Sequence, residues 1–414
     1  MWITIATTLL LAGGTSAPSS SPIVPSPSGG TKHYVYVTTE SDDHVHLVEF
    51  DTVTGKATIA QTMQVGYQPT EIEGPHGLTI SPDGKHWFVT MAHGKPFGVL
   101  YKYETGTNKL VGECELGLFP ATMQISDATG LLYCVNFDLH GDMLPSSVSI
   151  VDPDEMVEVA RTITGPMPHG SRISPDGMKH YSCAMMSGQL FEIDAVTFEV
   201  ARTLQLTTED KPMAMSGSMK KDTDDHGGHG EHGEHSDGHD GDEHNEHGGH
   251  GETKKLEGKS GQMAHMAHGS SPNPTWVYPH PKKDFLYVAL NGAEQVVEID
   301  TLAWKIVRRF ATDKGPYNVE ISPDGTRMVV TYKSAQGIGI WDLEKGKELA
   351  RLASSRRVTH GVVISKDSRY AFVSSEGVGS EMGTLDVVDL KENKTVSSVE
   401  LGLQAGGLYY WKAE

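Results

Sequence analysis

A repeat of short alternating strands and Pro/Asp/Gly turns runs along most of this 414-residue chain. The turn has the sequence ISPDG or a decayed form of it, at 80–84, 125–129, 173–177, 278–282, 321–325 and 364–368. A second marker, an alternating strand that ends in an acidic residue, occurs seven times, at Asp51, Glu104, Asp152, Asp194, Asp300, Asp342 and Asp389. A period of about 40 to 45 residues built from strands and turns predicts a β-propeller.

Each repeat is interpreted as a four-stranded blade, with strands A to D in chain order. The A strands are expected to start near His76, Ala121, His169, Thr275, Tyr317 and His360, and a seventh is expected at 406–411. Residues 33–65 supply three strands with no A strand before them. The sequence therefore predicts an all-β, seven-bladed propeller whose ring is closed by the C-terminal strand, which leaves no open sheet edge at the closure.

The segments outside the repeats suggest an exported protein. The apolar run 1–12 is shorter than the roughly 20 residues that a membrane span needs, and we interpret 1–17 as a signal peptide. Residues 18–32 are a flexible Pro/Ser-rich leader, and 33–412 are the propeller, interrupted by an insertion at 207–273 between blades four and five. The expected location is periplasmic or extracellular, with no membrane span in the mature chain.

Charge and cysteine content exclude several classes of function. The formal net charge of −20 argues against a nucleic-acid partner, which requires a basic surface. The three cysteines lack the spacing of a zinc or iron–sulfur site. We interpret them as small hydrophobic strand residues, at Cys114, Cys134 and Cys183.

The insertion carries the most unusual composition in the chain. Residues 222–252 hold eight His and eleven Asp or Glu with no aliphatic or aromatic side chain, so this stretch cannot fold alone. Imidazoles three residues apart on a glycine-rich backbone can converge on a borderline metal ion. The alternative is a solvated linker. The candidate ligands are His226, His229, His232, His235, His239, His244, His247 and His250.

Soft ligands flank this tract. His265 and His268 lie among methionines that would suit Cu(I) or would equally serve as packing filler, namely Met213, Met215, Met219, Met263 and Met266.

Five further histidines are expected on one propeller face, where the D-to-A and B-to-C connections emerge. His76, His169 and His360 start A strands, whereas His93 and His140 lie in B-to-C loops. As a set they predict a metal site, although loop hydrogen bonding is the alternative for any one of them. Further ligands or supporting partners on this face are Glu40, Asp42, Asp43, His44, Asp138, Asp142 and Glu376. His86, His180 and His280 fall at A-to-B turns on the opposite face and are expected to be structural. His33 and His46 have no neighbouring ligands in the sequence that would make a site.

The sequence YVYVTTE at 34–40 and the repeated SPDG turns resemble the YVTN family of seven-bladed propellers. An exported propeller with a His-rich segment also resembles the propeller-fold periplasmic zinc metallochaperones that serve ABC-type importers. That resemblance implies zinc as the ion, with copper as the alternative. It also implies transfer to a partner such as the solute-binding protein of a metal importer, and no catalysis.

Other functions stay open at this stage. Nitrous oxide reductase also gathers propeller histidines around copper, but this chain lacks the paired histidines of that pattern and any following cupredoxin domain. A lactonase-like hydrolase would need a carboxylate–metal or nucleophile arrangement that the sequence does not define. A third alternative is a surface protein-interaction propeller in which the His tract is incidental.

Overall fold

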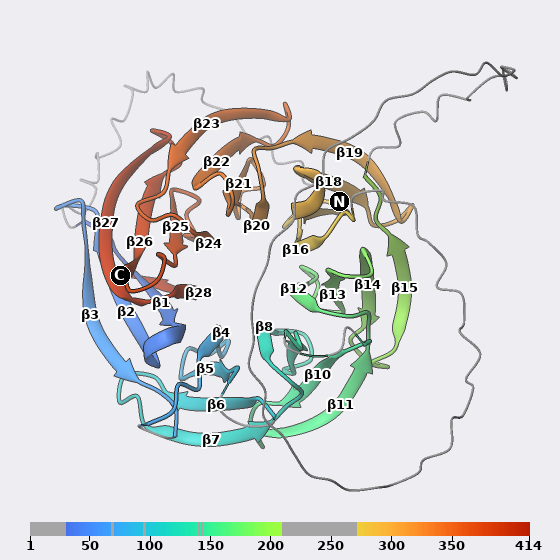
Figure 1. The fold of residues 1–414 in the computed structure, drawn as a ribbon, viewed down its shortest axis with the longest axis horizontal. Coiled ribbons are helices and arrows are strands. Elements are labelled where there is room, and N and C mark those ends of the chain that lie inside the picture. Colours follow the sequence, from blue (N-terminus) through green and yellow to red (C-terminus); the bar gives the residue numbers. More distant parts are fainter. Residues whose placement is uncertain (1–29, 68–69, 94–96, 140, 142–143, 209–270) are drawn as a thin grey trace, which may run out of the picture. The chain divides into compact units, whose positions relative to one another are not determined.

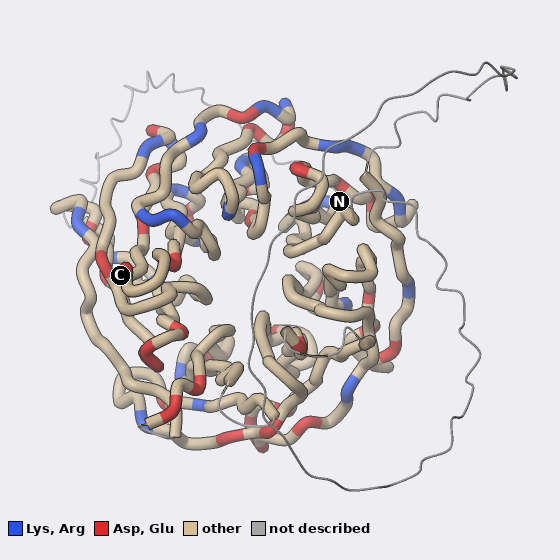
Figure 2. The backbone as a smooth tube through the Cα atoms, viewed as in Figure 1, with Lys and Arg blue, Asp and Glu red and all other residues tan. Residues whose placement is uncertain are grey.

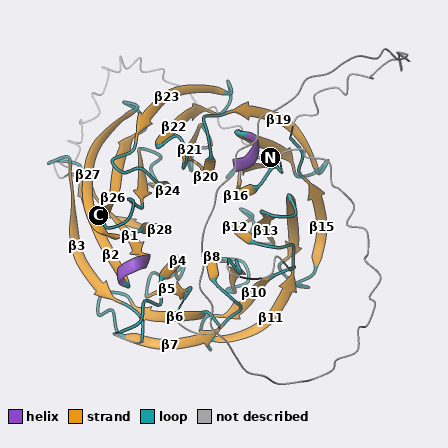
Figure 3. Ribbon diagram, in the orientation of Figure 1, coloured by secondary structure: helices purple, strands orange, loops and turns teal. Residues whose placement is uncertain are grey.

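The structure is a computed structural model that describes residues 30–67, 70–93, 97–139, 141, 144–208 and 271–414. Within these residues the strands form seven antiparallel sheets of four strands, arranged as blades around a central channel (Figure 1). Figure 3 shows that the described chain is almost all strand and loop, apart from the short 3₁₀ turns η1 (Glu40–Asp42) and η2 (Asn291–Ala293). The predicted all-β, seven-bladed fold is confirmed.

The strands of each blade follow the chain order from the channel outward. Blade two contains β4 (Pro75–Ile80), β5 (His86–Met91), β6 (Val99–Glu104) and β7 (Leu110–Glu115). Blade three contains β8 (Pro120–Ile125), β9 (Leu132–Asn136), β10 (Ser147–Asp152) and β11 (Val157–Ile163). Blade four contains β12 (Pro168–Ile173), β13 (Lys179–Ala184), β14 (Gln189–Asp194) and β15 (Val200–Gln205).

The second half of the ring repeats this plan. Blade five contains β16 (Pro274–Pro279), β17 (Phe285–Leu290), β18 (Gln295–Asp300) and β19 (Lys305–Ala311). Blade six contains β20 (Pro316–Ile321), β21 (Arg327–Tyr332), β22 (Gly337–Asp342) and β23 (Lys347–Ala353). Blade seven contains β24 (Thr359–Ile364), β25 (Tyr370–Ser375), β26 (Met382–Asp389) and β27 (Lys394–Leu403).

Blade one joins the two ends of the described chain. Its innermost strand is β28 (Ala405–Ala413), which pairs with β1 (Lys32–Thr39), followed by β2 (His44–Asp51) and β3 (Lys56–Gln64). The register places Val35 opposite Tyr410 and Val37 opposite Leu408. Closure of the ring by the C-terminal strand, as predicted, satisfies the backbone groups that an open first blade would leave unpaired.

Both repeat markers are turns that cap their own backbone. In the A-to-B turn of blade two, the Asp83 carboxylate accepts hydrogen bonds from Ser81 Oγ at 2.7 Å and from the Lys85 amide at 3.0 Å. Gly84 adopts φ +70°, a region that a side chain disfavours. The aspartates that end the C strands cap the next turn, as Asp51 does for the amide of Val53 at 2.7 Å.

Hydrophobic packing lies within and between the blades. Trp87 stacks on Tyr103 with ring centroids 4.2 Å apart, and it also contacts Tyr36 of blade one. The outermost strands β15 and β23 alternate between exposed and partly buried residues, and Figure 2 shows both acidic and basic residues around this rim. All three cysteines are buried and free, as expected.

Several predicted segments lie outside the described residues: the signal peptide, most of the leader, and residues 209–270 of the insertion between β15 and β16. No helix among the described residues is long and apolar enough to cross a membrane.

Candidate functional site

The second residue of the A strand is histidine in three blades, at the end of the blade where the D-to-A connection enters. His76, His169 and His360 follow Pro75, Pro168 and Thr359 at the starts of β4, β12 and β24. In all three strands the register with the B strand shifts by one residue at this point, which is a β-bulge. Bulges turn side chains out of the regular alternation, and they are common beside functional sites.

A glycine follows each of these histidines because the neighbouring innermost strand lies very close. A Cβ atom at Gly77 would lie 1.9 Å from the carbonyl oxygen of Ala121, and one at Gly170 would lie 2.4 Å from that of Thr275. At Gly361 it would lie 2.2 Å from Leu408. The repeated His-Gly pair therefore allows the A strands to approach until the imidazoles meet.

Glu40 holds two of the histidines. Its Oε2 lies 2.8 Å from His76 Nδ1, and its Oε1 lies 2.9 Å from His93 Nε2. Glu40 belongs to η1, which connects strands β1 and β2 of blade one, and its side chain is only 8 % exposed. Burial opposes ionisation, but the charges and hydrogen bonds of His76 and His93 outweigh it and hold the pKa of Glu40 well below its usual range. The carboxylate is therefore a charged acceptor for both rings.

His169 and His360 occupy a more deeply buried part of the same cluster. The hydroxyl of Tyr317 lies 3.1 Å from His169 Nε2, and the Tyr317 ring lies 4.8 Å from that of His360. Lys333 lies over the Tyr317 ring and forms a 2.9 Å ion pair with Glu376. Burial, followed by the charges of His76 and Lys333, lowers the pKa of His169 to about 3. Burial and the charge of Lys333 also lower the pKa of His360 well below its usual range.

His76, His169 and His360 differ in how their ring nitrogens are engaged, and His360 Nε2 lies 3.7 Å from Glu376 Oε1. His76 binds Glu40 through Nδ1 and His169 contacts Tyr317 through Nε2, whereas Nδ1 of His169 and Nδ1 of His360 are buried without a hydrogen-bond partner. A buried polar atom without a partner costs free energy, and these two nitrogens lie beside the other imidazoles of the cluster, where a ligand could satisfy them. Neutral imidazole is also the form that binds metal.

The rings stand close together. The centroid of His76 lies 5.8 Å from that of His169 and 6.1 Å from that of His360. Zn–N bonds of about 2.0 to 2.1 Å would bring ring centroids to roughly 5 Å apart. Among the described side chains, no group of three or more His, Cys, Asp or Glu is already arranged to hold a metal ion. Binding would therefore require the rings to turn their open nitrogens toward one another.

The remaining predicted residues have varied placements. Asp43 accepts hydrogen bonds from the amides of Glu73 and Gly74, and Asp42 accepts one from Leu403, so both acidic side chains brace loops. His44 lies 3.4 Å from Asp42. The predicted ligands outside the described residues are His140, Asp142 and every His and Met of the insertion.

The other histidines lie away from the cluster. His180 is fully buried against the Tyr133 ring, and neither of its ring nitrogens has a hydrogen-bond partner among the described residues. His280 Nδ1 accepts the amide of Lys282, and His33, for which no companions were expected, has its Nδ1 2.9 Å from the Tyr410 hydroxyl.

Sequence reasoning missed Tyr317 and Lys333. Tyr317 occupies the same second position of an A strand as the three histidines, and Lys333 immediately follows the B strand of blade six, as Glu376 does in blade seven. An alignment of the repeats would have placed both on this face. They were overlooked because neither is a common metal ligand.

Comparisons with known proteins support the fold and nothing finer. No protein-family model matches the sequence, and no curated protein matches it. Hydrazine synthase from Kuenenia stuttgartiensis is a structural neighbour at TM-score 0.57 and 17% identity, over 84% of this chain and 95% of that one. A putative 6-phosphogluconolactonase from Bacteroides fragilis aligns at TM-score 0.62 and 12% identity, over 94% and 100%.

A functionally unknown protein from Desulfotomaculum acetoxidans aligns at TM-score 0.59 and 14% identity, over 91% and 98%. At these identities the likeness shows the propeller fold alone. Enzymes occur among such neighbours, but fold does not carry activity to this chain.

Proposed function

We propose that this chain is an exported zinc-binding propeller that captures Zn²⁺ on its His-rich insertion, holds the ion at the channel mouth and passes it to a partner protein. The observation that supports this most is the cluster itself. The ring centroid of His76 lies 5.8 Å from that of His169 and 6.1 Å from that of His360, and His169 and His360 each have a buried Nδ1 without a hydrogen-bond partner.

The environment of the cluster suits a divalent ion. Ionised Glu40 accepts the Nδ1–H of His76, an arrangement that leaves Nε2 as the ligand nitrogen and raises its basicity. Low pKa values keep His169 and His360 neutral, so no proton competes at those rings near pH 7. Imidazole also binds copper, which remains the alternative ion.

Transfer would follow from the difference between the two kinds of site. The insertion offers many candidate ligands in the sequence, which suits rapid capture, whereas the cluster offers a few buried ones, which suits retention. Tethering both on one chain raises the local concentration of the ion at the cluster. A solute-binding protein of a metal importer is the proposed acceptor, and the periplasm is the proposed compartment.

Zinc titration of untagged protein in competition with a chromophoric chelator tests this proposal. His76→Gln and His360→Gln should each weaken the tightest site at least tenfold and leave the weaker sites unchanged. Deletion of 220–252 should remove the weaker sites and leave the tightest site unchanged. His180→Gln is the matched control, because it removes a buried histidine from the opposite end of a blade. Full zinc affinity in the His76→Gln, His360→Gln double variant would overturn the proposal.

A further inference from the structure

The central channel contains a cavity of about 430 Å³ in addition to the histidine cluster. One end reaches His76 and His360, and the other end is lined by the exposed turn residues Asp127, Pro175 and Lys366. The cavity therefore opens among the A-to-B turns, on the face opposite the histidines. Its volume falls within the range of about 300 to 1,000 Å³ that is typical of small-molecule sites.

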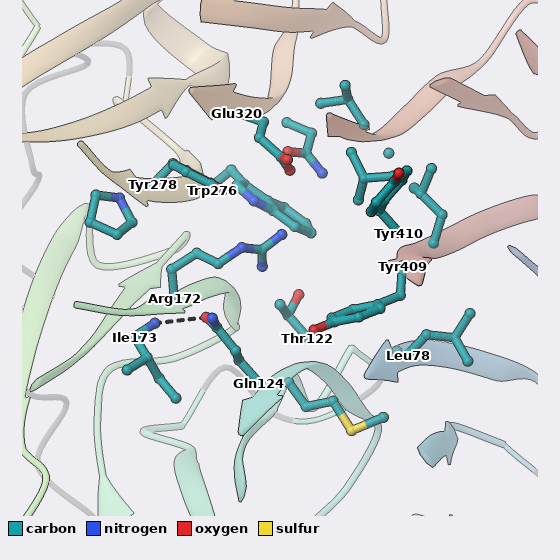
Figure 4. A pocket seen from close by; sticks show the side chains of 18 of the residues that line it. Leu78, Thr122, Gln124, Arg172, Ile173, Trp276, Tyr278, Glu320, Tyr409 and Tyr410 are labelled. Carbon is teal, nitrogen blue, oxygen red and sulfur yellow. Dashed lines mark hydrogen bonds between the residues drawn. The ribbon is translucent and has the colours of Figure 1, made fainter. Parts of the chain in front are cut away.

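Arg172 is a cation inside this cavity, on β12. Its guanidinium carbon lies 5.1 Å from the ring centre of Trp276 and 5.5 Å from that of Tyr278 (Figure 4). Its Nη1 donates a hydrogen bond to the carbonyl of Ser171. Among the described residues, no carboxylate lies within ion-pair distance of Arg172. A guanidinium held by aromatic faces and without a paired anion is a ready receptor for a carboxylate.

Two further polar atoms in the lining are unpartnered. The indole Nε1 of Trp276 and the side-chain oxygen Oδ1 of Asn318 are buried with no hydrogen-bond partner, and the two residues are 7% and 1% exposed. They offer one donor and one acceptor. Neighbouring polar groups are already engaged, because Gln124 accepts the amide of Ile173 (Figure 4) and Glu320 accepts that of Ile364.

The walls favour a flat apolar body. Trp276, Tyr278 and Tyr409 present aromatic rings, with Leu78 among the aliphatic residues of the lining (Figure 4). A doubly charged phosphate is disfavoured, because one arginine would face it together with the acidic residues Glu320, Asp127 and Asp176 of the same lining.

We propose that this cavity binds a small aromatic carboxylate, with the carboxylate on Arg172 and the ring against Trp276 and Tyr409. The Trp276 N–H and the Asn318 oxygen would select a ligand that carries an acceptor and a donor at its other end. The cavity shares His76 and His360 with the proposed zinc site at one end, but the proposed ligand contacts Arg172, Trp276 and Tyr409 and needs no metal ion.

The test is calorimetric titration of the metal-free full chain with 2-naphthoate, its neutral isostere 2-naphthamide, and glucose 6-phosphate. We expect saturable binding of 2-naphthoate, at least tenfold tighter than 2-naphthamide. Arg172→Met should remove this preference and Arg172→Lys should reduce it. Arg161→Met is the matched control, because Arg161 forms an ion pair with Glu158 on the outer strand β11.

Three results would overturn the proposal: no saturable binding of 2-naphthoate, equal affinity for the acid and the amide, or unchanged affinity in the Arg172 variants. Tighter binding of glucose 6-phosphate would also overturn it, in favour of a phosphate ligand. If Arg172→Met fails to fold, Arg172→Lys provides the second test, because it keeps the positive charge, loses the bidentate geometry and should still weaken 2-naphthoate binding. Because the titration uses metal-free protein, its outcome does not depend on the proposed zinc function.

Discussion

The hydroxyl of Tyr317 lies 3.1 Å from Nε2 of His169, although 148 residues separate the two in the sequence. Blade five lies between their strands, and its residue at the equivalent position is the small Thr275, which is fully buried. Thr275 donates a 2.6 Å hydrogen bond to the carbonyl of Tyr317. The tyrosine therefore reaches past a neighbouring blade to fix one nitrogen of the histidine.

This contact links Tyr317 to the proposed metal site. For Nδ1 of His169 to bind an ion, the ring proton must be on Nε2 and must be donated to the Tyr317 oxygen. We expect Tyr317→Phe to lower zinc affinity about tenfold or more, since lost supporting contacts to ligand histidines typically have that effect. Stability should fall by about 1 kcal/mol. Chelator competition and thermal melting measure the two effects, with Tyr278→Phe, deeper in the channel, as the control. Unchanged zinc affinity would remove Tyr317 from the site.

Glu40 should matter for both folding and binding. Glu40→Gln replaces the shared charged acceptor of His76 and His93 with a neutral group that can accept from only one of them. We expect a loss of about 1 to 3 kcal/mol in unfolding free energy, because a buried imidazole N–H is left without its partner, and a weaker zinc site. Glu49→Gln, which breaks an ion pair with the partly exposed Lys32, is the control and should change little. Chemical denaturation that shows equal stability for both variants would contradict this.

The repeats allowed the fold to be predicted closely. Each expected A strand starts within about one residue of its observed position, because Pro/Asp/Gly turns and C-strand aspartates fix the backbone locally. The convergence of His76, His169 and His360, and the proximity of Glu40, followed from equivalent positions in a closed ring. The sequence could not separate Glu40 from Asp43, because which of two nearby carboxylates faces the channel depends on the left-handed φ of 54° at Asp43.

The cavity was beyond sequence reasoning for a different reason. Arg172, Tyr278 and Glu320 occupy the same fifth position of three A strands, so the repeat places them at equivalent points around the channel. Whether such side chains fill a channel or line a cavity depends on their combined volume and on how closely seven strands approach. The His-Gly pairs indicate a narrow channel mouth, but no sequence pattern indicates how wide the channel is further along the A strands.

Glu320 should make stability depend on pH. Its burial, opposed by Arg172 and by the amide of Ile364, raises its pKa from 4.5 to about 7. Between those values the folded state binds more protons than the unfolded state, so stability is greatest at low pH within this window and falls as pH rises toward 7. The change is on the order of 3 kcal/mol. Denaturation of Glu320→Gln at pH 5 and pH 7.5 should show a smaller decline than wild type. Identical pH profiles would contradict the raised pKa, and Glu158→Gln on the surface is the control.

The C-terminal strand should be essential for folding. Deleting 405–414 would remove the innermost strand of blade one, expose the backbone groups of β1 along that edge, and uncover the apolar cluster that contains Val35, Phe50 and Tyr410. The free energy lost with this strand is a large part of the roughly 5 to 15 kcal/mol by which a typical domain is stable. We expect the truncated protein to aggregate on expression.

Because an aggregated variant has no measurable unfolding transition, Tyr410→Ala gives a graded test. This substitution should lower the unfolding free energy by about 3 to 5 kcal/mol, because it removes packing and the contact with His33. Deletion of 220–252 is the control and should barely change the melting of the metal-free protein. A soluble tail-deleted protein that melts at the wild-type temperature would contradict the closure of the ring by β28.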